Sequence, residues 1–314
     1  MMANNDKVSI VLPTLNGAKF IRQSIESCRK QSHSNIELIV VDGGSTDGTL
    51  EIVQQINDPR IRVVHQHANV DRLPGALNIG FAQVSGEYFT WTQDDDYFSP
   101  NAIEILVGQL KKNPEVDFVY SGLWLIDESG EIIGEPDLLP AEALYWTNPI
   151  GHCFLYTRAV ANQVGLYDPE YFMAEDVHYW MKTFQRVRMM RVPDRLYYHR
   201  WHDQSLTIKI YGNYYAARLA ARARRDIFRI SRRQYLSQIS SAYVMEAFAA
   251  RSNGDLERVR KCALLGLLTN PGWLRNRGVV SIAVESLVGS RRLHELRRRL
   301  MRRFNEDVLF SLRS

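Results

Sequence analysis

The fold of this chain is indicated by one stretch of sequence, Ile36-Glu37-Leu38-Ile39-Val40-Val41, followed directly by Asp42-Gly43-Gly44-Ser45-Thr46-Asp47-Gly48-Thr49. The first six residues are β-branched and apolar enough for a buried strand. The two glycines behind Asp42 let the backbone turn sharply and let a ligand approach closely. Residues 49–56 then return to helical spacing, so this stretch predicts a strand, a ligand-binding turn and a helix.

Strand and helix signals alternate on both sides of this stretch. We expect further strands at Val8–Leu12, Ile61–His65 and Tyr88–Thr92, and further helices at Ala18–Gln31 and Pro74–Val84. Such alternation predicts a parallel sheet covered by helices on both faces. Ligands in such sheets bind at the carboxyl ends of the strands.

Three polar segments follow three of the predicted strands: Pro13–Gly17, Asp42–Thr49 and the triplet Asp94-Asp95-Asp96. Because the carboxyl ends of parallel strands lie at one edge of a sheet, we expect the segments to converge on one crevice. The turn after Val41 lacks the Lys-Ser/Thr of a P-loop and the G-x-G-x-x-G of a dinucleotide site. Asp42 is placed to accept hydrogen bonds from a nucleobase or ribose, whereas Ser45, Thr46 or Asp47 suits a helix N-cap.

Composition describes an ordinary globular protein of 314 residues, 45% apolar and 24% charged, and excludes disorder. The polar N-terminus runs into a short apolar segment, which fits neither a secretory signal nor a spanning helix. The cysteines Cys28, Cys153 and Cys262 match no zinc spacing or disulfide framework, so we expect reduced, buried thiols.

Charge divides the chain into two halves. Residues 1–204 contain 17 Lys and Arg against 27 Asp and Glu, whereas residues 205–314 contain 22 against 8. The net charge of +4 therefore combines an acidic first half with a strongly basic second half.

The triplet Asp94-Asp95-Asp96 comes directly after the strand expected at Tyr88–Thr92. Clustered carboxylates repel one another unless they are protonated or neutralised by a cation, and oxygen ligands favour Mg²⁺ or Mn²⁺. The alternative is a solvated acidic turn, in which Asp96 or Ser99 caps the helix that Pro100 begins. The position after a buried strand favours a metal site.

These segments resemble the family 2 glycosyltransferases, which are inverting nucleotide-sugar enzymes with the GT-A fold. Val8–Asn16 is similar to the first strand and nucleotide loop of that family, Ile39–Thr49 to its most recognisable segment, and Gly86-Glu87-Tyr88 also matches. The likeness covers roughly residues 7–207, and several motifs occur in order.

The resemblance implies an α/β fold with a GT-A type, mostly parallel sheet, followed by a C-terminal α-helical region. The catalytic domain is then expected at 1–207, with a nucleotide-sugar half of roughly 1–98 and an acceptor half of roughly 99–207. A basic helical region is expected at 208–314.

The resemblance also implies the donor site, in which Pro13, Thr14, Asn16 and Asp42 position the nucleotide. The D-x-D-D motif of the family maps onto Gln93-Asp94-Asp95-Asp96, with Gln93 in place of the first aspartate. In this register Asp95 is the metal ligand, Asp94 faces the ribose or the water shell of the metal, and Asp96 is either a supporting residue or the helix cap.

Phe172–Trp180 resembles the E-D segment of the family, which implies that Asp176 is the general base and Glu175 a supporting or acceptor-binding carboxylate. Without the family, Glu175 and Asp176 are first-turn acids of the helix expected at Val177–Arg186, favoured there by its dipole.

Tyr197–Thr207 is similar to the tyrosine-rich, histidine-containing loop that closes the catalytic domain of the family. The resemblance implies that His202 contacts the metal or diphosphate and that Arg200 neutralises phosphate oxygens, with His199 as the competing histidine.

Trp146–Gly151 resembles the variable acceptor-side segment of the family. Trp146 then stacks on a sugar face, or else is a buried core residue. His152 is expected to contact the acceptor, and His178 to pack within its helix.

The basic half carries no catalytic constellation. Two helices are expected at Gln234–Ser252 and Leu256–Leu268, similar to one tetratricopeptide hairpin. The segment Arg291–Phe304 has one apolar face at helical spacing, surrounded by arginines. This face consists of Leu293, Leu296, Leu300 and Phe304. Such a helix could lie on anionic lipid, dock on the acidic N-terminal half of the chain, or contact a second subunit. We expect no binding to nucleic acid, because no nucleic-acid recognition fold accompanies the basic charge.

The function implied is inverting transfer of a sugar from a nucleotide-diphosphate donor to an acceptor hydroxyl, with Mn²⁺ or Mg²⁺. A glycan or glycolipid acceptor in bacterial polysaccharide synthesis, and a cytoplasmic location with peripheral contact to the inner face of the membrane, fit the basic tail. A sugar-1-phosphate nucleotidyltransferase would need a glycine-rich basic loop, which Pro13–Asn16 is not. A non-catalytic nucleotide-sugar-binding or scaffold protein is favoured by Gln93 alone.

Overall fold

The computed structural model of the protein describes residues 6–205 and 214–288. The chain divides into two compact units, Met1–Ile208 with Asp226–Arg229, and Lys209–Arg225 with Ile230–Ser314.

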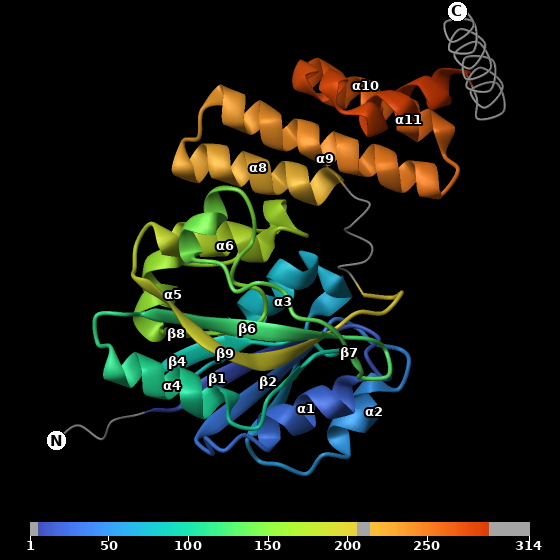
Figure 1. The fold of residues 1–314 in the computed structure, drawn as a ribbon. Helices are drawn as coiled ribbons and strands as arrows, with labels where there is room; N and C mark the ends of the chain where they lie inside the picture. Colours follow the sequence, from blue (N-terminus) through green and yellow to red (C-terminus); the bar gives the residue numbers. More distant parts are fainter. Residues whose placement is uncertain (1–5, 206–213, 289–314) are drawn as a thin grey trace, which may run out of the picture. The chain divides into compact units, whose positions relative to one another are not determined.

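One mixed sheet forms the centre of the first unit (Figure 1). Its strands are β1 (Val8–Thr14), β2 (Ile36–Asp42), β3 (Ile61–His65), β4 (Tyr88–Trp91), β5 (Tyr97–Phe98), β6 (Phe118–Ile126), β7 (Ile132–Gly134), β8 (Phe154–Thr157) and β9 (Met189–Arg200). Their order is β3-β2-β1-β4-β8-β6-β9-β5, with β7 on β6. The neighbours β3, β2, β1 and β4 are parallel, β9 is parallel to β6, and β8 runs antiparallel to both β4 and β6. The predicted strands and mostly parallel sheet are confirmed.

Helices cover both faces of this sheet, as predicted. They are α1 (Ile21–Arg29), α2 (Thr49–Gln54), α3 (Arg72–Phe81), α4 (Ala102–Lys112), α5 (Arg158–Val164) and α6 (Glu175–Phe184), with the 3₁₀ turns η1 (His67–Asn69), η2 (Ala141–Tyr145) and η3 (Pro169–Tyr171). In Figure 1, α1, α2 and α4 lie on one side of the sheet, and α3 and α6 lie on the other.

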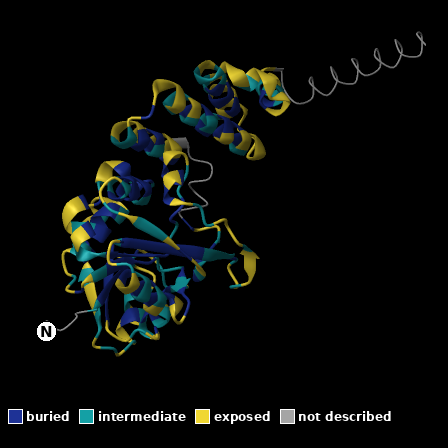
Figure 2. Ribbon diagram, turned by 60° about the vertical axis from the view of Figure 1, so that its left-hand side comes forward, coloured by how far each residue is buried: buried dark blue, intermediate teal, exposed yellow. Residues whose placement is uncertain are grey.

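Side-chain alternation along the strands explains the two layers. Leu38 and Val40 of β2 belong to the core with α1, α2 and α4. Val41 faces the opposite side, where a Cβ on Gly80 of α3 would lie 3.0 Å from its methyl group. The central strands β1 and β2 are buried between these layers (Figure 2), and β2 is apolar from Leu38 to Val41.

Aromatic packing holds α6 on the sheet. Trp180 is fully buried, and its ring centroid lies 4.4 Å from that of Phe154 and 5.2 Å from that of Phe118. Because α6 is held by this cluster, its first turn, with Glu175 and Asp176, has a defined position against β8 and β6.

The second unit is helical, with α8 (Tyr214–Phe228), α9 (Arg232–Ser252), α10 (Leu256–Thr269), η4 (Pro271–Arg275) and α11 (Arg277–Val288). Ser231 and Gln234 form a capping box at the start of α9, and Asp255 caps α10, so both predicted helices are confirmed. Ala247 of α9, Val259 of α10 and Ile282 of α11 belong to one small core.

Cys28, Cys153 and Cys262 are free and buried, as predicted. Within the described ranges 6–205 and 214–288, the helices are too short or too polar to cross a membrane. The amphipathic segment expected at Arg291–Phe304 lies outside the described residues.

Candidate active site

The three polar segments meet where β1, β2 and β4 end. Thr14 pairs with Asp42 across the β1–β2 ladder, and Val11 pairs with Trp91 across the β1–β4 ladder. The Thr14 hydroxyl donates a hydrogen bond to Oδ2 of Asp94 at 2.5 Å. The predicted convergence of these segments at one edge of the sheet is therefore observed.

The loops after β1 and β2 interlock. The carboxylate of Asp42 is 2% exposed and accepts hydrogen bonds from the backbone N–H groups of Gly44 and Ser45. Asn16 adopts a left-handed conformation, with φ of 59°, and its side-chain oxygen accepts from the N–H of Thr46 at 2.8 Å. Pro13 lies half-buried in β1, one residue before these contacts begin. Asp42 and Asn16 thus shape a turn whose backbone can approach a nucleotide.

The helix after this turn begins at Thr49, as predicted, but its N-cap is Gly48, so the expected N-cap role of Ser45, Thr46 or Asp47 is wrong. Oδ1 of Asp47 accepts a hydrogen bond from the N–H of Thr49 at 3.1 Å, and Oδ2 accepts from the N–H of Ala18 at 3.0 Å. Burial raises the pKa of Asp47, but the hydrogen bonds from Thr49 and Ala18 outweigh it and lower the pKa overall. Asp47 is therefore a structural residue that joins the two loops.

Each carboxylate of the triplet has different partners. Asp94 accepts from Thr14, and burial together with the charge of Asp95 raises its pKa to about 7. Oδ2 of Asp95 lies 3.0 Å from Nε2 of His202, whereas its Oδ1 is buried without a hydrogen-bond partner among the described residues. Burial, and next the charge of Asp96, raise the pKa of Asp95.

Asp96 is the most enclosed of the three, at 1% exposed. Its Oδ2 lies 2.9 Å from Nδ1 of His199, and its Oδ1 accepts from the backbone N–H of Arg200 at 2.8 Å. Burial raises its pKa, but His199 outweighs burial and the pKa is lowered overall. Asp96 is therefore a charged group neutralised from within the protein.

Helix capping does not explain the triplet. The N-cap of α4 is Asn101, and no side chain caps this helix. The alternative of a solvated acidic turn in which Asp96 or Ser99 caps this helix is therefore wrong. Asp96 is buried against His199 and precedes β5, and Ser99 precedes the N-cap residue.

The surroundings of Asp95 fit a divalent cation. An orphaned carboxylate oxygen inside a like-charged cluster is costly unless a positive charge approaches it. Carboxylate oxygens are the ligands that Mn²⁺ and Mg²⁺ prefer, and the imidazole of His202 is a second donor beside this one. Asp95 and His202 are thus the residues that could hold the ion.

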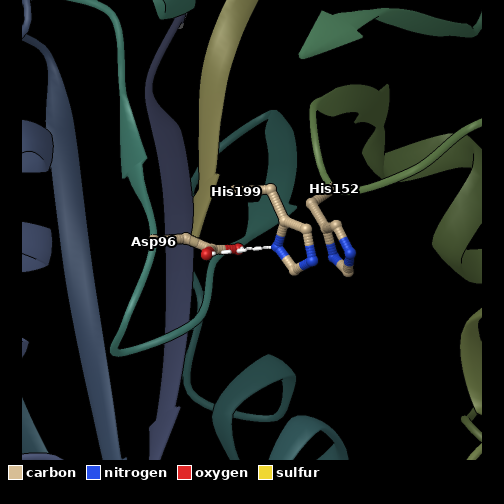
Figure 3. A group of neighbouring side chains, drawn as sticks. All are labelled: Asp96, His152 and His199. Carbon is tan, nitrogen blue, oxygen red and sulfur yellow. Dashed lines mark hydrogen bonds and ion pairs between the residues drawn. The ribbon is translucent and has the colours of Figure 1, made fainter. Parts of the chain in front are cut away.

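A second group, Asp96, His152 and His199, brings its ligand atoms within 4.8 Å of one another (Figure 3). The two imidazole rings are stacked, with centroids 4.3 Å apart and planes 21° from parallel. Lone pairs lie in the ring planes, so stacked rings direct them side by side and not toward a common ion. Asp96 already accepts from His199 and Arg200. We assign this group to the support of the triplet.

Arg200 makes contacts that the sequence did not reveal. Its Nε donates to the carbonyl oxygen of Asp95, its Nη1 to the carbonyls of Asp127 and Glu128, and its Nη2 to Oε1 of Gln23. The guanidinium lies 4.5 Å from the centroid of the Phe20 ring. Arg200 thus holds the backbone of the triplet, and the phosphate contact expected for it would require these bonds to break.

The predicted base lies in the first turn of α6. Oδ1 of Asp176 accepts from the N–H of Val177, and Oδ2 accepts from Nδ2 of Asn148 at 2.8 Å. Burial raises the pKa of Asp176. Glu175 is 6% exposed and accepts from the N–H of Met173, and burial together with the charge of Asp176 raises its pKa to about 8. A carboxylate with a raised pKa is a stronger base.

The acceptor-side segment Trp146–Gly151 begins with a solvent-exposed side chain. Trp146 is 62% exposed, so the alternative of a buried core tryptophan is wrong. Nδ1 of His152 lies 2.9 Å from Nε2 of Gln93. His178 stacks on Tyr171 with centroids 3.9 Å apart, in the packing role expected for it.

Sequence reasoning missed Asn148 as a partner of Asp176, Gln93 as a partner of His152 and His199 as the partner of Asp96. The separations in these pairs are 28, 59 and 103 residues. Only the substitution of an amide at the first position of the acidic motif could have drawn attention to Gln93.

Comparison with solved structures identifies the class of protein, a GT-A fold. The crystal structure of residues 1–349 of S. aureus TarS in complex with UDP-GlcNAc matches with a TM-score of 0.61 and 18% identity, over 90% of this chain and 92% of that one. The mannosyltransferase PcManGT from Pyrobaculum calidifontis, in complex with GDP-Man and Mn²⁺, matches with a TM-score of 0.57 and 16% identity, over 90% and 87% of the two chains. At such identities the likeness shows the fold alone.

Sequence comparison identifies the family. The profile described as "Glycosyl transferase family 2" matches residues 9–165, and the chain belongs to this family. An uncharacterized glycosyltransferase of Haemophilus influenzae is 30% identical over 229 residues, which are 68% of this chain and 70% of that protein.

Two further relatives are matched over less of their own length. An uncharacterized glycosyltransferase of Rickettsia felis is 32% identical over 215 residues, 65% of this chain but only 35% of that protein. The putative colanic acid biosynthesis glycosyl transferase WcaA of Escherichia coli is 31% identical over 166 residues, 52% of this chain and 57% of that protein.

Proposed function

We propose that the protein is an inverting glycosyltransferase that moves a sugar from a nucleotide-diphosphate donor to an acceptor hydroxyl with the help of Mn²⁺ or Mg²⁺. The observation that carries the proposal is the buried Oδ1 of Asp95, which has no hydrogen-bond partner within residues 6–205 and 214–288 and lies beside His202 at the edge where β1, β2 and β4 end. Membership of family 2 supports it.

On the donor side, Pro13, Thr14, Asn16 and Asp42 position the nucleotide in the interlocked loops. Asp94 accepts the hydrogen bond of the Thr14 hydroxyl and contributes to the same donor surface. The contacts of Arg200 with Asp95, Asp127, Glu128 and Gln23 support a role in holding the triplet rather than the diphosphate.

On the acceptor side, Asp176 takes the hydroxyl proton as the acceptor oxygen forms its bond to C1 of the sugar. The bond from C1 to the diphosphate breaks in the same step, and the electron pair leaves with the diphosphate. When bound, a divalent ion held by Asp95 and His202 supplies positive charge that stabilises this leaving group. Glu175, Trp146 and His152 contribute to the acceptor surface.

We further propose residues 1–207 as the catalytic domain and 208–314 as a basic region that contacts a membrane surface or a second copy of the chain. A glycan or glycolipid acceptor at the cytoplasmic face of the membrane suits this arrangement, because anionic lipid attracts basic helices. The similarity to a relative named for colanic acid biosynthesis supports a bacterial polysaccharide as the product.

Calorimetry tests the proposal. UDP, GDP and their sugars are titrated into the protein with Mn²⁺, with Mg²⁺ and with chelator, and the tightest-binding sugar nucleotide is then assayed for hydrolysis. Metal-dependent binding followed by hydrolysis supports a transferase and names its donor class. Binding without hydrolysis or transfer favours the non-catalytic alternative, and no binding at all contradicts both.

A further inference from the structure

The segment 148–152 is attached to the candidate site at both ends. At one end, Nδ2 of Asn148 donates to Oδ2 of Asp176 at 2.8 Å. At the other, Nδ1 of His152 lies 2.9 Å from Nε2 of Gln93, two residues before Asp95. The segment therefore connects the loop of the acidic triplet with the first turn of α6.

The segment between these attachments is short and closely packed. Ile150 is 1% exposed, and its N–H donates to the side-chain oxygen of Asn148 at 3.3 Å. Gly151 has a φ of 60°, a left-handed conformation that glycine adopts readily, and a Cβ there would lie 3.1 Å from Leu123. A displacement at Gln93 would thus be transmitted toward Asp176 through few adjustable bonds.

Charge explains why an amide suits position 93. His199 is paired with Asp96, and His152 stacks on His199. Burial, and next the neighbouring His199, lower the pKa of His152 to about 3, so its ring is neutral and Nδ1 can accept from the Gln93 amide. A carboxylate at position 93 would favour protonation of His152. Two imidazolium rings, His152 and His199, would then be stacked on each other, and like charges in contact repel.

We infer that Gln93 and Asn148 are positioning residues that, acting through the segment 148–152, set the acceptor base Asp176 relative to the donor held at Asp95. The inference rests on the proposed function, since it assigns Asp176 and Asp95 their roles. It gives Gln93, where the motif of the family has an aspartate, a task specific to this chain.

Amide hydrogen exchange tests the attachment without any substrate. In Gln93→Met, which keeps the length of the side chain but loses the amide, we expect the amides of residues 150–152 to exchange about fivefold faster, as the loss of one net hydrogen bond predicts. Gln66→Met is the matched control. Its amide holds Val70 and Arg72 in a different loop, so exchange at 150–152 should stay unchanged.

A double-mutant cycle tests the pairing. His152→Phe keeps an aromatic ring against His199 but removes the nitrogen that meets Gln93. If the two residues act as a pair, the double variant exchanges no faster at 150–152 than the faster single variant. Additive acceleration contradicts the pairing.

A split between binding and turnover tests the positioning role. In Gln93→Met and in Asn148→Ala, affinity for UDP or GDP with Mn²⁺ should stay within about twofold of the wild type, while kcat for hydrolysis of the donor sugar falls at least about tenfold. A parallel loss of nucleotide affinity would place Gln93 on the donor side and overturn the inference. Unchanged amide exchange at residues 150–152 in Gln93→Met would also overturn the inference, even if the enzyme is active. A wild-type protein that hydrolyses no donor refutes the proposed function instead.

Discussion

Nδ1 of His199 lies 2.9 Å from Oδ2 of Asp96, and both side chains are buried. Asp95, the preceding residue, has an Oδ1 without a hydrogen-bond partner among the residues that the structure describes. Adjacent aspartates therefore differ in what neutralises them. Asp96 is paired with a histidine from β9, while Asp95 retains the oxygen that suits a cation.

Removing His199 should destabilise the protein strongly. His199→Leu leaves Asp96 buried without its charge partner, which typically costs about 3–5 kcal/mol of unfolding free energy. Urea unfolding in the presence of chelator measures this. The double variant Asp96→Asn/His199→Leu should be less destabilised than His199→Leu alone, because no uncompensated charge remains, and the reverse order would contradict the ion pair.

The same pair predicts a pH dependence of stability. Burial favours the neutral form of each group, but their interaction outweighs burial. Asp96 raises the pKa of His199 above 6.5, and His199 lowers the pKa of Asp96 below 3.8. The contribution of Asp96 is present above pH 3.8 and is lost as pH falls through its lowered pKa. That of His199 is present below pH 6.5 and is lost as pH rises through its raised pKa.

The stability difference between the wild type and Asp96→Asn/His199→Leu should therefore be largest between about pH 4 and pH 6.5. Urea unfolding with chelator across pH 3–9 measures the difference. A flat profile would show that the two groups do not interact as ions.

Asp95→Asn should separate stability from binding. Because burial and Asp96 raise the pKa of Asp95, removing its charge should raise the unfolding free energy and the Tm of the metal-free protein. Metal-dependent affinity for the nucleotide should fall at least tenfold. Thermal unfolding and calorimetry measure the two effects. Asp137→Asn, at an exposed position, is the control and should change neither. Retained metal-dependent binding would remove Asp95 as the ligand.

If Asp176 is the base, as proposed, Asp176→Asn should lower kcat by about 10²–10⁴-fold and leave donor affinity unchanged, because such a base acts only on the acceptor proton. In the wild type, burial raises the pKa of Asp176, so turnover should rise with pH through a value above the ordinary 3.8. Steady-state kinetics from pH 4 to pH 9 measure both. Unchanged turnover in the variant would exclude Asp176 as the base.

Glu175→Gln should alter stability in a pH-dependent way. Glu175 keeps its proton to a pKa of about 8 in the folded protein, against 4.5 ordinarily, so stability of the wild type falls as pH rises between these values. The variant should match the wild type near pH 4 and exceed its unfolding free energy at pH 9. Denaturant unfolding at both pH values measures the difference, and an unchanged difference would mean that folding does not raise the pKa of Glu175.

Two glycine substitutions should have opposite effects. A Cβ on Gly17 would lie 2.2 Å from Oδ2 of Asp94 and 2.8 Å from the hydroxyl oxygen of Thr14, so Gly17→Ala should push these groups apart and cost about 1–3 kcal/mol. Gly108 lies inside α4 with open space around it, so Gly108→Ala should stabilise by about 0.5–1 kcal/mol. Thermal unfolding compares them. Nucleotide affinity should fall only in Gly17→Ala.

Much of the fold could be predicted from local pattern. The apolar run of β2 and the helical spacing of α1 depend on residues within one element, and both elements were found. The first and last residues of a helix follow less directly from local pattern. The pattern predicts a helix from Pro74 to Val84, whereas α3 runs from Arg72 to Phe81, because packing against β1 and β2 decides where the helix begins.

The position of the site in the fold could be predicted from the sequence, but the contacts between its side chains could not. The convergence of Thr14, Asp42 and Asp94 follows from parallel strands ending at one edge, a rule that needs no coordinates. The bonds of Arg200 to Asp95 and Gln23 span 105 and 177 residues and follow no sequence period.

The sequence by itself determined the strands, the helices, the acidic edge and the family, because these depend on short-range periodicity and on motifs in order. Only the tertiary structure decided that Asp96 pairs with His199, that Oδ1 of Asp95 lacks a hydrogen-bond partner in the described part of the chain, and that Trp146 is open to solvent. The physical reason is that burial and charge balance depend on neighbours brought together from distant parts of the chain. Asp96 meets His199 only because β5 pairs with β9.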